Sequence, residues 1–195
     1  IAFAKENNLF VYDISSKSTE QITTDGVRNS IINGITDWVY EEEFAFVRAF
    51  DWSGDSKKLA YIRFDESQVP EFSMSMFQKD LYPKIETFKY PKAGEKNSEV
   101  SLHIYDVASA NTKNIDLEKY SDFYIARMKW TNDSNVLCAQ ILNRHQDNLD
   151  LLFIDGTSGT TKVVLNEKDK AYVDVTDNLT FLKDNSFTVY ESLPR

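Results

Sequence analysis

The sequence contains little cysteine, little histidine and few positive charges. Its 195 residues include one cysteine and two histidines, which lie far apart and form no zinc-binding pattern. Lysine and arginine number 22 against 31 aspartates and glutamates, and no basic cluster offers a surface for nucleic acid. No run of about 18 apolar residues occurs. We therefore expect no metal site, no cofactor, no nucleic-acid partner and no membrane span in this chain.

Sustained helical periodicity is also absent, and short alternating apolar runs take its place. Aromatic residues make up 13% of the chain, and strands favour such side chains. Polar turns separate the runs, a pattern typical of an all-β protein. The six clearest runs are Leu9 to Ile14, Leu59 to Phe64, Ser101 to Val107, Val136 to Leu142, Leu149 to Ile154 and Phe187 to Tyr190.

Some of these runs belong to a repeat. Residues 49–60 align with residues 127–138, and residues 180–187 form a weaker copy, each a strand, a polar turn and a second strand. Asp155 follows Asp106 by 49 residues, at the ends of two similar strands. A period of about 50 residues with four strands per unit is typical of a β-propeller blade. We therefore expect a partial β-propeller of roughly three to four blades over residues 1–195, as a segment of a longer polypeptide.

One interval is too long for this repeat. Trp130 follows Trp52 by 78 residues, and the excess lies at about residues 65–97. This stretch holds three of the four prolines, two methionines and several aromatic residues, a composition unlike that of a disordered linker. We expect an inserted arm that packs on another surface, with a second subunit as the candidate partner.

Residues 33–44 carry the most informative pattern, Asn-Gly-Ile-Thr-Asp-Trp-Val-Tyr-Glu-Glu-Glu-Phe. Three consecutive carboxylates repel one another, and the aromatic residues beside them lower the local dielectric. Such a cluster attracts a cation, either an ammonium group or a metal ion. Asp37 or Thr36 is a suitable N-cap for a helix over about residues 36–46. A simpler interpretation is that the acidic residues only stabilise the first turn of one short helix.

The same stretch resembles the double-glutamate signature of the dipeptidyl peptidase IV family of serine exopeptidases. Three further motifs follow in the family's order and at compatible distances, namely Val69-Pro70, Tyr90 to Gly94 and Asn143 to Asn148. The resemblance runs from about Asn8 to Asp155, and this combination is far more specific than one short motif. It implies the N-terminal propeller portion of an enzyme that releases dipeptides with proline or alanine in second place.

The resemblance also implies roles for individual residues. In the family, the second and third glutamates of the run bind the free α-ammonium group of a peptide substrate, and these are Glu42 and Glu43 here. The supporting residues would be Asp37, Trp38, Tyr40 and Glu41. Two charge-assisted hydrogen bonds in a partly dry cavity would favour peptides with a free N-terminus and would limit cleavage to dipeptides.

Further implied partners are a second subunit and a catalytic domain. The inserted arm corresponds to the one through which these enzymes form homodimers, and its candidate contact residues are Val69, Pro70, Phe72, Tyr82 and Tyr90. The family's nucleophile lies in a Gly-x-Ser-x-Gly turn of an α/β-hydrolase domain, and this chain has no such pentapeptide. We therefore expect the segment to be inactive alone and to work with the hydrolase domain of its parent protein. Animal members of the family carry disulfides, whereas this chain has a single cysteine and cannot form one within itself. In this respect the chain resembles bacterial members, which would work in the periplasm or outside the cell.

Two other functions also fit the sequence. A catalytically inactive homologue would use the propeller as a protein-binding module, although such a protein has no use for an ammonium-binding glutamate pair. An unrelated propeller scaffold would instead bind calcium through its acidic helix.

Overall fold

The computed structural model describes residues 1–189, which form an almost entirely β structure with one short helix. The chain divides into two compact units, residues 1–48 with 64–99 and residues 49–63 with 100–189. The all-β class predicted from the alternating runs is confirmed.

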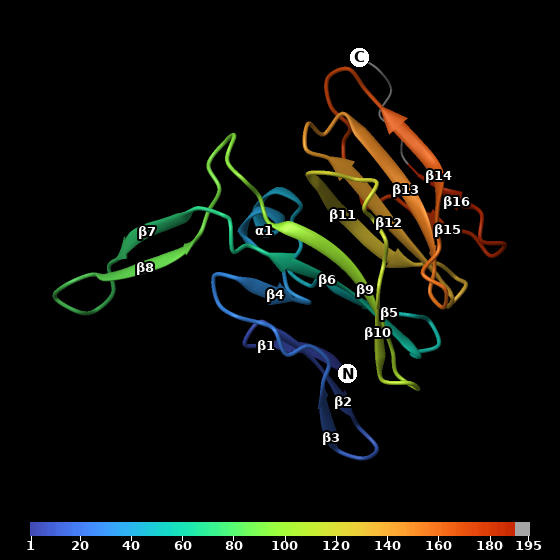
Figure 1. The fold of residues 1–195 in the computed structure, drawn as a ribbon, viewed down its shortest axis with the longest axis horizontal. Helices are drawn as coiled ribbons and strands as arrows, with labels where there is room; N and C mark the ends of the chain where they lie inside the picture. Colours follow the sequence, from blue (N-terminus) through green and yellow to red (C-terminus); the bar gives the residue numbers. More distant parts are fainter. Residues whose placement is uncertain (190–195) are drawn as a thin grey trace. The chain divides into compact units, whose positions relative to one another are not determined.

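The first unit contains a three-stranded antiparallel sheet, the helix and a hairpin (Figure 1). Its elements are β1 (Ala2–Lys5), β2 (Asn8–Asp13), β3 (Ser18–Gln21), β4 (Ile31–Asn33), α1 (Trp38–Glu43), β7 (Glu71–Met76) and β8 (Lys84–Lys89). The strand order of the sheet is β1-β2-β3, so β2 is central. Phe10 of β2 pairs with Phe3 of β1, and the two rings stack with their centroids 5.4 Å apart.

The second unit contains two larger sheets and a short hairpin. One sheet is built from β5 (Phe50–Trp52), β6 (Lys58–Asp65), β9 (Glu99–Asp106) and β10 (Asn111–Asn114), with β9 between β6 and β10 and with β5 paired to β6. The other is an antiparallel meander of β11 (Phe123–Trp130), β12 (Val136–Asn143), β13 (Asn148–Asp155) and β14 (Thr161–Lys168). The hairpin pairs β15 (Thr180–Phe181) with β16 (Phe187–Thr188).

The meander has the organisation expected of one propeller blade, four antiparallel strands in chain order. Six consecutive residues of β12 are buried, so this strand is covered on both faces. Cys138 of β12 packs with Leu151 and Leu179 in a core cluster that Phe153 and Phe181 border. The predicted number of blades stays a prediction.

The repeated phrases of the sequence mark equivalent hairpins, namely β5–β6, β11–β12 and β15–β16. The first two turns share a backbone hydrogen bond. The Ser53 N–H donates to the Lys58 carbonyl at 2.9 Å, and the Thr131 N–H donates to the Val136 carbonyl at 3.0 Å. The repeat therefore reflects a common turn geometry as well as a common spacing.

Each of the six predicted runs contains a strand, and the described bounds differ from the prediction by at most two residues. The end of the last run, Tyr190, lies outside the described residues. The stretch predicted as an inserted arm contains two regular strands. It contains the hairpin β7–β8, which is paired from Glu71 with Lys89 to Met76 with Lys84.

Candidate functional site

The three glutamates of the signature lie on α1, whose ends are both defined by hydrogen bonds. Asp37 is the N-cap, and its side-chain Oδ1 accepts the Tyr40 N–H at 3.0 Å. The Phe44 N–H donates to the Tyr40 carbonyl at 3.2 Å, and Ala45 then takes a left-handed conformation with a φ of 56°. A left-handed residue after the last turn ends a helix, so α1 stops there. The predicted N-cap is confirmed as Asp37.

The helix is shorter than the predicted range of about 36–46, because the chain on either side of it forms backbone pairs instead. Ile35 and Arg48 form an antiparallel bridge, and the Thr36 N–H donates to the Val47 carbonyl at 3.1 Å. The Thr36 hydroxyl also donates to the Phe46 carbonyl at 3.1 Å. These bonds close the base of the acidic-helix loop, which we define as residues 35–48.

The N-cap residue Asp37 also accepts a hydrogen bond from a residue far away in the sequence. Asp37 is buried, and its Oδ2 accepts a hydrogen bond from the Ser98 hydroxyl at 2.5 Å. Burial raises the pKa of Asp37 above its usual range, while the hydrogen bonds from Ser98 and from the Tyr40 N–H oppose that rise. Ser98 lies 61 residues from Asp37, and no pattern in the sequence marks it as a partner of the cap residue.

The aromatic residues of the signature form the base of the loop. Tyr40 is almost fully buried, and its ring centroid lies 4.8 Å from that of Phe64 and 5.1 Å from that of Phe44. Trp38 is half-buried, and its ring centroid lies 4.2 Å from that of Tyr90. Both residues were predicted to support the glutamates, and both anchor the helix that carries them.

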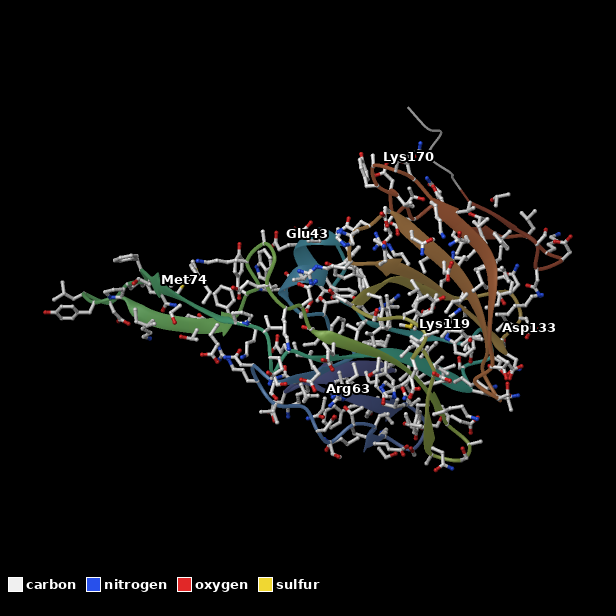
Figure 2. All side chains as sticks on the ribbon, turned by 45° about the horizontal axis from the view of Figure 1, so that its top comes forward. Glu43, Arg63, Met74, Lys119, Asp133 and Lys170 are labelled. Carbon is white, nitrogen blue, oxygen red and sulfur yellow. The ribbon has the colours of Figure 1, made fainter. Side chains whose placement is uncertain are left out.

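The three carboxylates lie at the surface of the helix. Glu41, Glu42 and Glu43 are all exposed, and Figure 2 shows Glu43 at the surface of α1. Successive helical residues point about 100° apart, so Glu42 and Glu43 can meet one guest only close to the end of the helix. Within this chain the three carboxylates are solvated, unlike the partly dry cavity that the resemblance implied.

A second buried carboxyl group lies near Asp37. Glu66 is 6% exposed, and its backbone N–H donates to the Ser30 carbonyl at 2.8 Å. Burial first, and then the charge of Asp37, raise the pKa of Glu66 to about 7, although Lys89 opposes the shift. Lys89 itself donates to the Val69 carbonyl at 2.9 Å. No sequence pattern marks Glu66, because its burial depends on packing between segments far apart in the chain.

Residues 1–189 contain neither a candidate metal site nor a candidate membrane-spanning helix. No group of three or more histidine, cysteine, aspartate or glutamate side chains there is arranged to hold a metal ion. No helix in the same residues is both long enough and apolar enough to cross a bilayer.

The five predicted contact residues of the arm fall into two groups. Val69 is 4% exposed, and Tyr90 donates its N–H to the Pro70 carbonyl at 2.9 Å, so these three lie at the base of the arm. Phe72 is partly exposed and Tyr82 is 78% exposed, so these two lie on the surface.

Five further residues extend the exposed apolar surface of the arm. They are Met74, Met76, Phe77, Leu81 and Ile85, with Phe77 at 83% and Leu81 at 90% exposure. Figure 2 shows Met74 on β7, where all six residues are exposed. We define the hairpin arm as residues 71–89.

Comparison with known sequences supports the resemblance. A "Probable dipeptidyl-aminopeptidase B" of Coccidioides posadasii is 36% identical over 178 residues, which are 84% of this chain and 19% of that protein. Dipeptidyl aminopeptidase B of Saccharomyces cerevisiae is 33% identical over 193 residues, which are 95% of this chain and 24% of that protein. The chain therefore spans about a fifth to a quarter of the length of these relatives.

The fold and the family agree with these similarities. The crystal structure of Porphyromonas gingivalis dipeptidyl peptidase 4 matches with a TM-score of 0.91 and 44% identity, over 95% of this chain and 27% of that one. The model of the dipeptidyl peptidase IV (DPP IV) N-terminal region matches residues 1–194. The chain belongs to the dipeptidyl peptidase IV N-terminal region family.

Proposed function

We propose that this chain is the substrate-gating, N-terminus-recognising propeller segment of a serine-type dipeptidyl peptidase that releases X-Pro and X-Ala dipeptides. The observation that carries the proposal is the pair Glu42 and Glu43, two exposed carboxylates on a helix that buried residues anchor. The names of the similar proteins, dipeptidyl aminopeptidase B and dipeptidyl peptidase 4, support the same activity.

The chemistry of the pair suits a free N-terminus. An α-ammonium group has three N–H donors, and two carboxylates offer it charge-assisted hydrogen bonds of about 2.7 to 2.9 Å. An acylated N-terminus has neither the charge nor those donors. It would leave the carboxylates without their partner, so the site selects against it as well as for the free amine.

A fixed ammonium position also determines where the peptide is cut. Two residues span at most about 7 Å, so a nucleophile at that reach from the glutamates meets the bond after the second residue. The helix must therefore be rigid for the cut to be precise. The cap of Asp37, the paired flanks of the loop and the buried ring of Tyr40 supply that rigidity.

In this proposal the nucleophile, the general base and the oxyanion hole belong to the α/β-hydrolase domain of the full-length protein. That domain is thus the first partner of the chain, and it would supply the drier surroundings that the exposed glutamates need. The segment alone is expected to be inactive. By resemblance to its family, the protein works in the periplasm or outside the cell.

The second partner is another copy of the same protein, bound through the hairpin arm. Phe77, Leu81 and Tyr82 at the end of the hairpin are between 78% and 90% exposed. Leaving three large apolar side chains in contact with water is unfavourable, and such exposed apolar surface marks interaction sites. Aromatic side chains such as Phe77 and Tyr82 are enriched at protein interfaces.

The test of the peptidase proposal uses the full-length protein and the substrate Gly-Pro-p-nitroanilide, with a free or an acetylated N-terminus. We expect cleavage of the free-amine substrate only. Replacing both glutamates (Glu42→Gln/Glu43→Gln) should lower kcat/KM by about a hundredfold or more, because two charge-assisted bonds are weakened. The matched control is Glu118→Gln, an exposed glutamate outside the acidic-helix loop, which should change kcat/KM less than about threefold.

Each other outcome has a distinct meaning. If the wild-type protein cleaves neither substrate, the chain belongs to an inactive homologue that only binds proteins. If the double variant cleaves as fast as the wild type, the glutamates only stabilise the first turns of α1, and the proposed ammonium site is wrong.

A further inference from the structure

Two residues outside the acidic-helix loop hold the start of α1, and both lie in one short connection. Tyr90 directly follows β8, and Ser98 directly precedes β9. The ring of Tyr90 contacts Trp38, the first residue of α1, and the hydroxyl of Ser98 bonds to Asp37, its N-cap. The connection that leaves the hairpin arm is therefore attached at both ends to the beginning of the helix.

With the hydrogen bond from Ser98, both oxygens of the buried Asp37 carboxylate have a donor. One oxygen of Asp37 is used by the Tyr40 N–H, and the other accepts the Ser98 hydroxyl at 2.5 Å. This is the length of a charge-assisted O–H···O⁻ bond, which is about twice as strong as a neutral one. Without the hydroxyl, the second oxygen would lose its donor while the side chain stays buried, and Asp37 would turn away from its cap position.

The contact of Tyr90 continues into the hairpin arm. Its ring centroid lies 4.2 Å from that of Trp38, 5.4 Å from that of Phe72 on β7 and 6.3 Å from that of Phe88 on β8. These four rings form a continuous aromatic chain from the arm to the helix. Trp38 and Glu42 are four residues apart, so they share one face of α1, and a shift of Trp38 moves Glu42 directly.

We propose that Ser98 and Tyr90 are positioning residues for Glu42 and Glu43, and that the connection between β8 and β9 sets where the two glutamates meet the substrate's ammonium group. This inference rests on the proposed function of the glutamate pair. Neither residue touches the substrate, since each acts through the first two positions of the helix. The connection thus makes the hairpin arm and the acidic helix one mechanical element within the first unit.

The test measures KM and kcat of the full-length protein for Gly-Pro-p-nitroanilide. Ser98→Ala should raise KM about tenfold and change kcat less than about twofold, because the loss concerns one hydrogen bond to a charged group. Ser98→Thr keeps the hydroxyl and should restore KM. Tyr90→Leu, which removes the ring stacked on Trp38, should also raise KM. The matched control is Ser73→Ala, since the Ser73 hydroxyl bonds to that of Thr87 at 2.7 Å within the hairpin arm, away from α1.

A double-mutant cycle separates positioning from general stability. Adding Ser98→Ala to Glu42→Gln/Glu43→Gln should raise KM no further, because Ser98 acts only through that pair. An additive increase, or an unchanged KM in Ser98→Ala alone, would overturn the positioning role. If KM is unchanged both in Ser98→Ala and in Glu42→Gln/Glu43→Gln, the proposed function of the glutamate pair fails together with the positioning role of Ser98. If only the glutamate variant raises KM, the proposed function stands and the inference about Ser98 and Tyr90 is wrong.

Discussion

The acidic-helix loop and the hairpin arm use aromatic side chains in opposite ways. In the loop, Tyr40 and Phe44 are buried while the three glutamates face solvent. In the arm, every residue of β7 is exposed, and so are Phe77 and Tyr82 in the turn. Both regions belong to the first unit and both are rich in aromatic residues, so composition alone does not distinguish them.

The difference lies in what packs behind each region. The loop is closed by the bridge between Ile35 and Arg48, and the ring of Tyr40 packs on Phe64, so its aromatic residues have a second layer to contact. A two-stranded hairpin has no second layer of its own and is marginally stable in water by itself. The loop therefore presents charge from a fixed base, whereas the arm presents an exposed apolar surface, which the proposed second subunit would cover.

The largest expected effect concerns the arm. The triple variant Phe77→Ser/Leu81→Ser/Tyr82→Ser should convert a dimer of the full-length protein into monomers. Burying three such side chains contributes at least about 4.5 kcal/mol, which corresponds to about a thousandfold change in Kd. Sedimentation velocity at several protein concentrations measures this change.

The control for this variant carries Ile14→Ser and Val27→Ser, which are also exposed apolar positions but lie outside the arm. It should keep the mass of the wild type. A wild-type protein that is monomeric at all concentrations, or a triple variant that stays dimeric, would show that the arm does not form the subunit interface.

The sequence predicted those parts of the two regions that depend on neighbouring residues. The Asp37 cap and the glutamate run follow from a pattern of a few consecutive residues, and the strands follow from their alternation. Ser98 and Glu66 could not be predicted, because their importance comes from contacts with segments far away in the chain. Leu81 is exposed and Val69 is buried, although both are apolar residues of the inserted stretch at about residues 65–97, because exposure likewise depends on what packs behind each side chain.

A smaller effect is expected at Glu66, which lies between the two regions, beside Asp37 and Lys89. Its pKa of about 7 in the folded protein exceeds the ordinary value of 4.5, so the folded state keeps a proton that the unfolded chain releases first. Stability therefore falls as the pH rises from about 4.5 to about 7, and it stays lower above that range. Glu66→Gln removes this loss and should stabilise the protein at pH 8 by about 1 to 3 kcal/mol.

Urea denaturation of the wild type and of Glu66→Gln at pH 4 and pH 8 measures the effect. The two proteins should be nearly equally stable at pH 4, where Glu66 is protonated in the folded state and mostly protonated in the unfolded chain. An equal gain at both pH values would instead mean that the glutamine packs better and that the titration of Glu66 has no part in it.

The smallest effect concerns the end of the acidic helix, and it tests how firmly the loop is fixed. Ala45 has a φ of 56°, a left-handed conformation that costs a residue with a Cβ atom about 1 to 2 kcal/mol. Glycine avoids that cost but loses more entropy on folding, so Ala45→Gly should stabilise the protein by about 0.5 kcal/mol net. Ala93→Gly, in the connection after the arm, is the matched control, because Ala93 is exposed and has no positive φ. There the same substitution should destabilise by about 0.5 kcal/mol. Thermal unfolding of both variants gives the two signs. Shifts of the same sign would mean that the loop relaxes around Ala45, and that α1 is a less rigid base for Glu42 and Glu43 than its hydrogen bonds indicate.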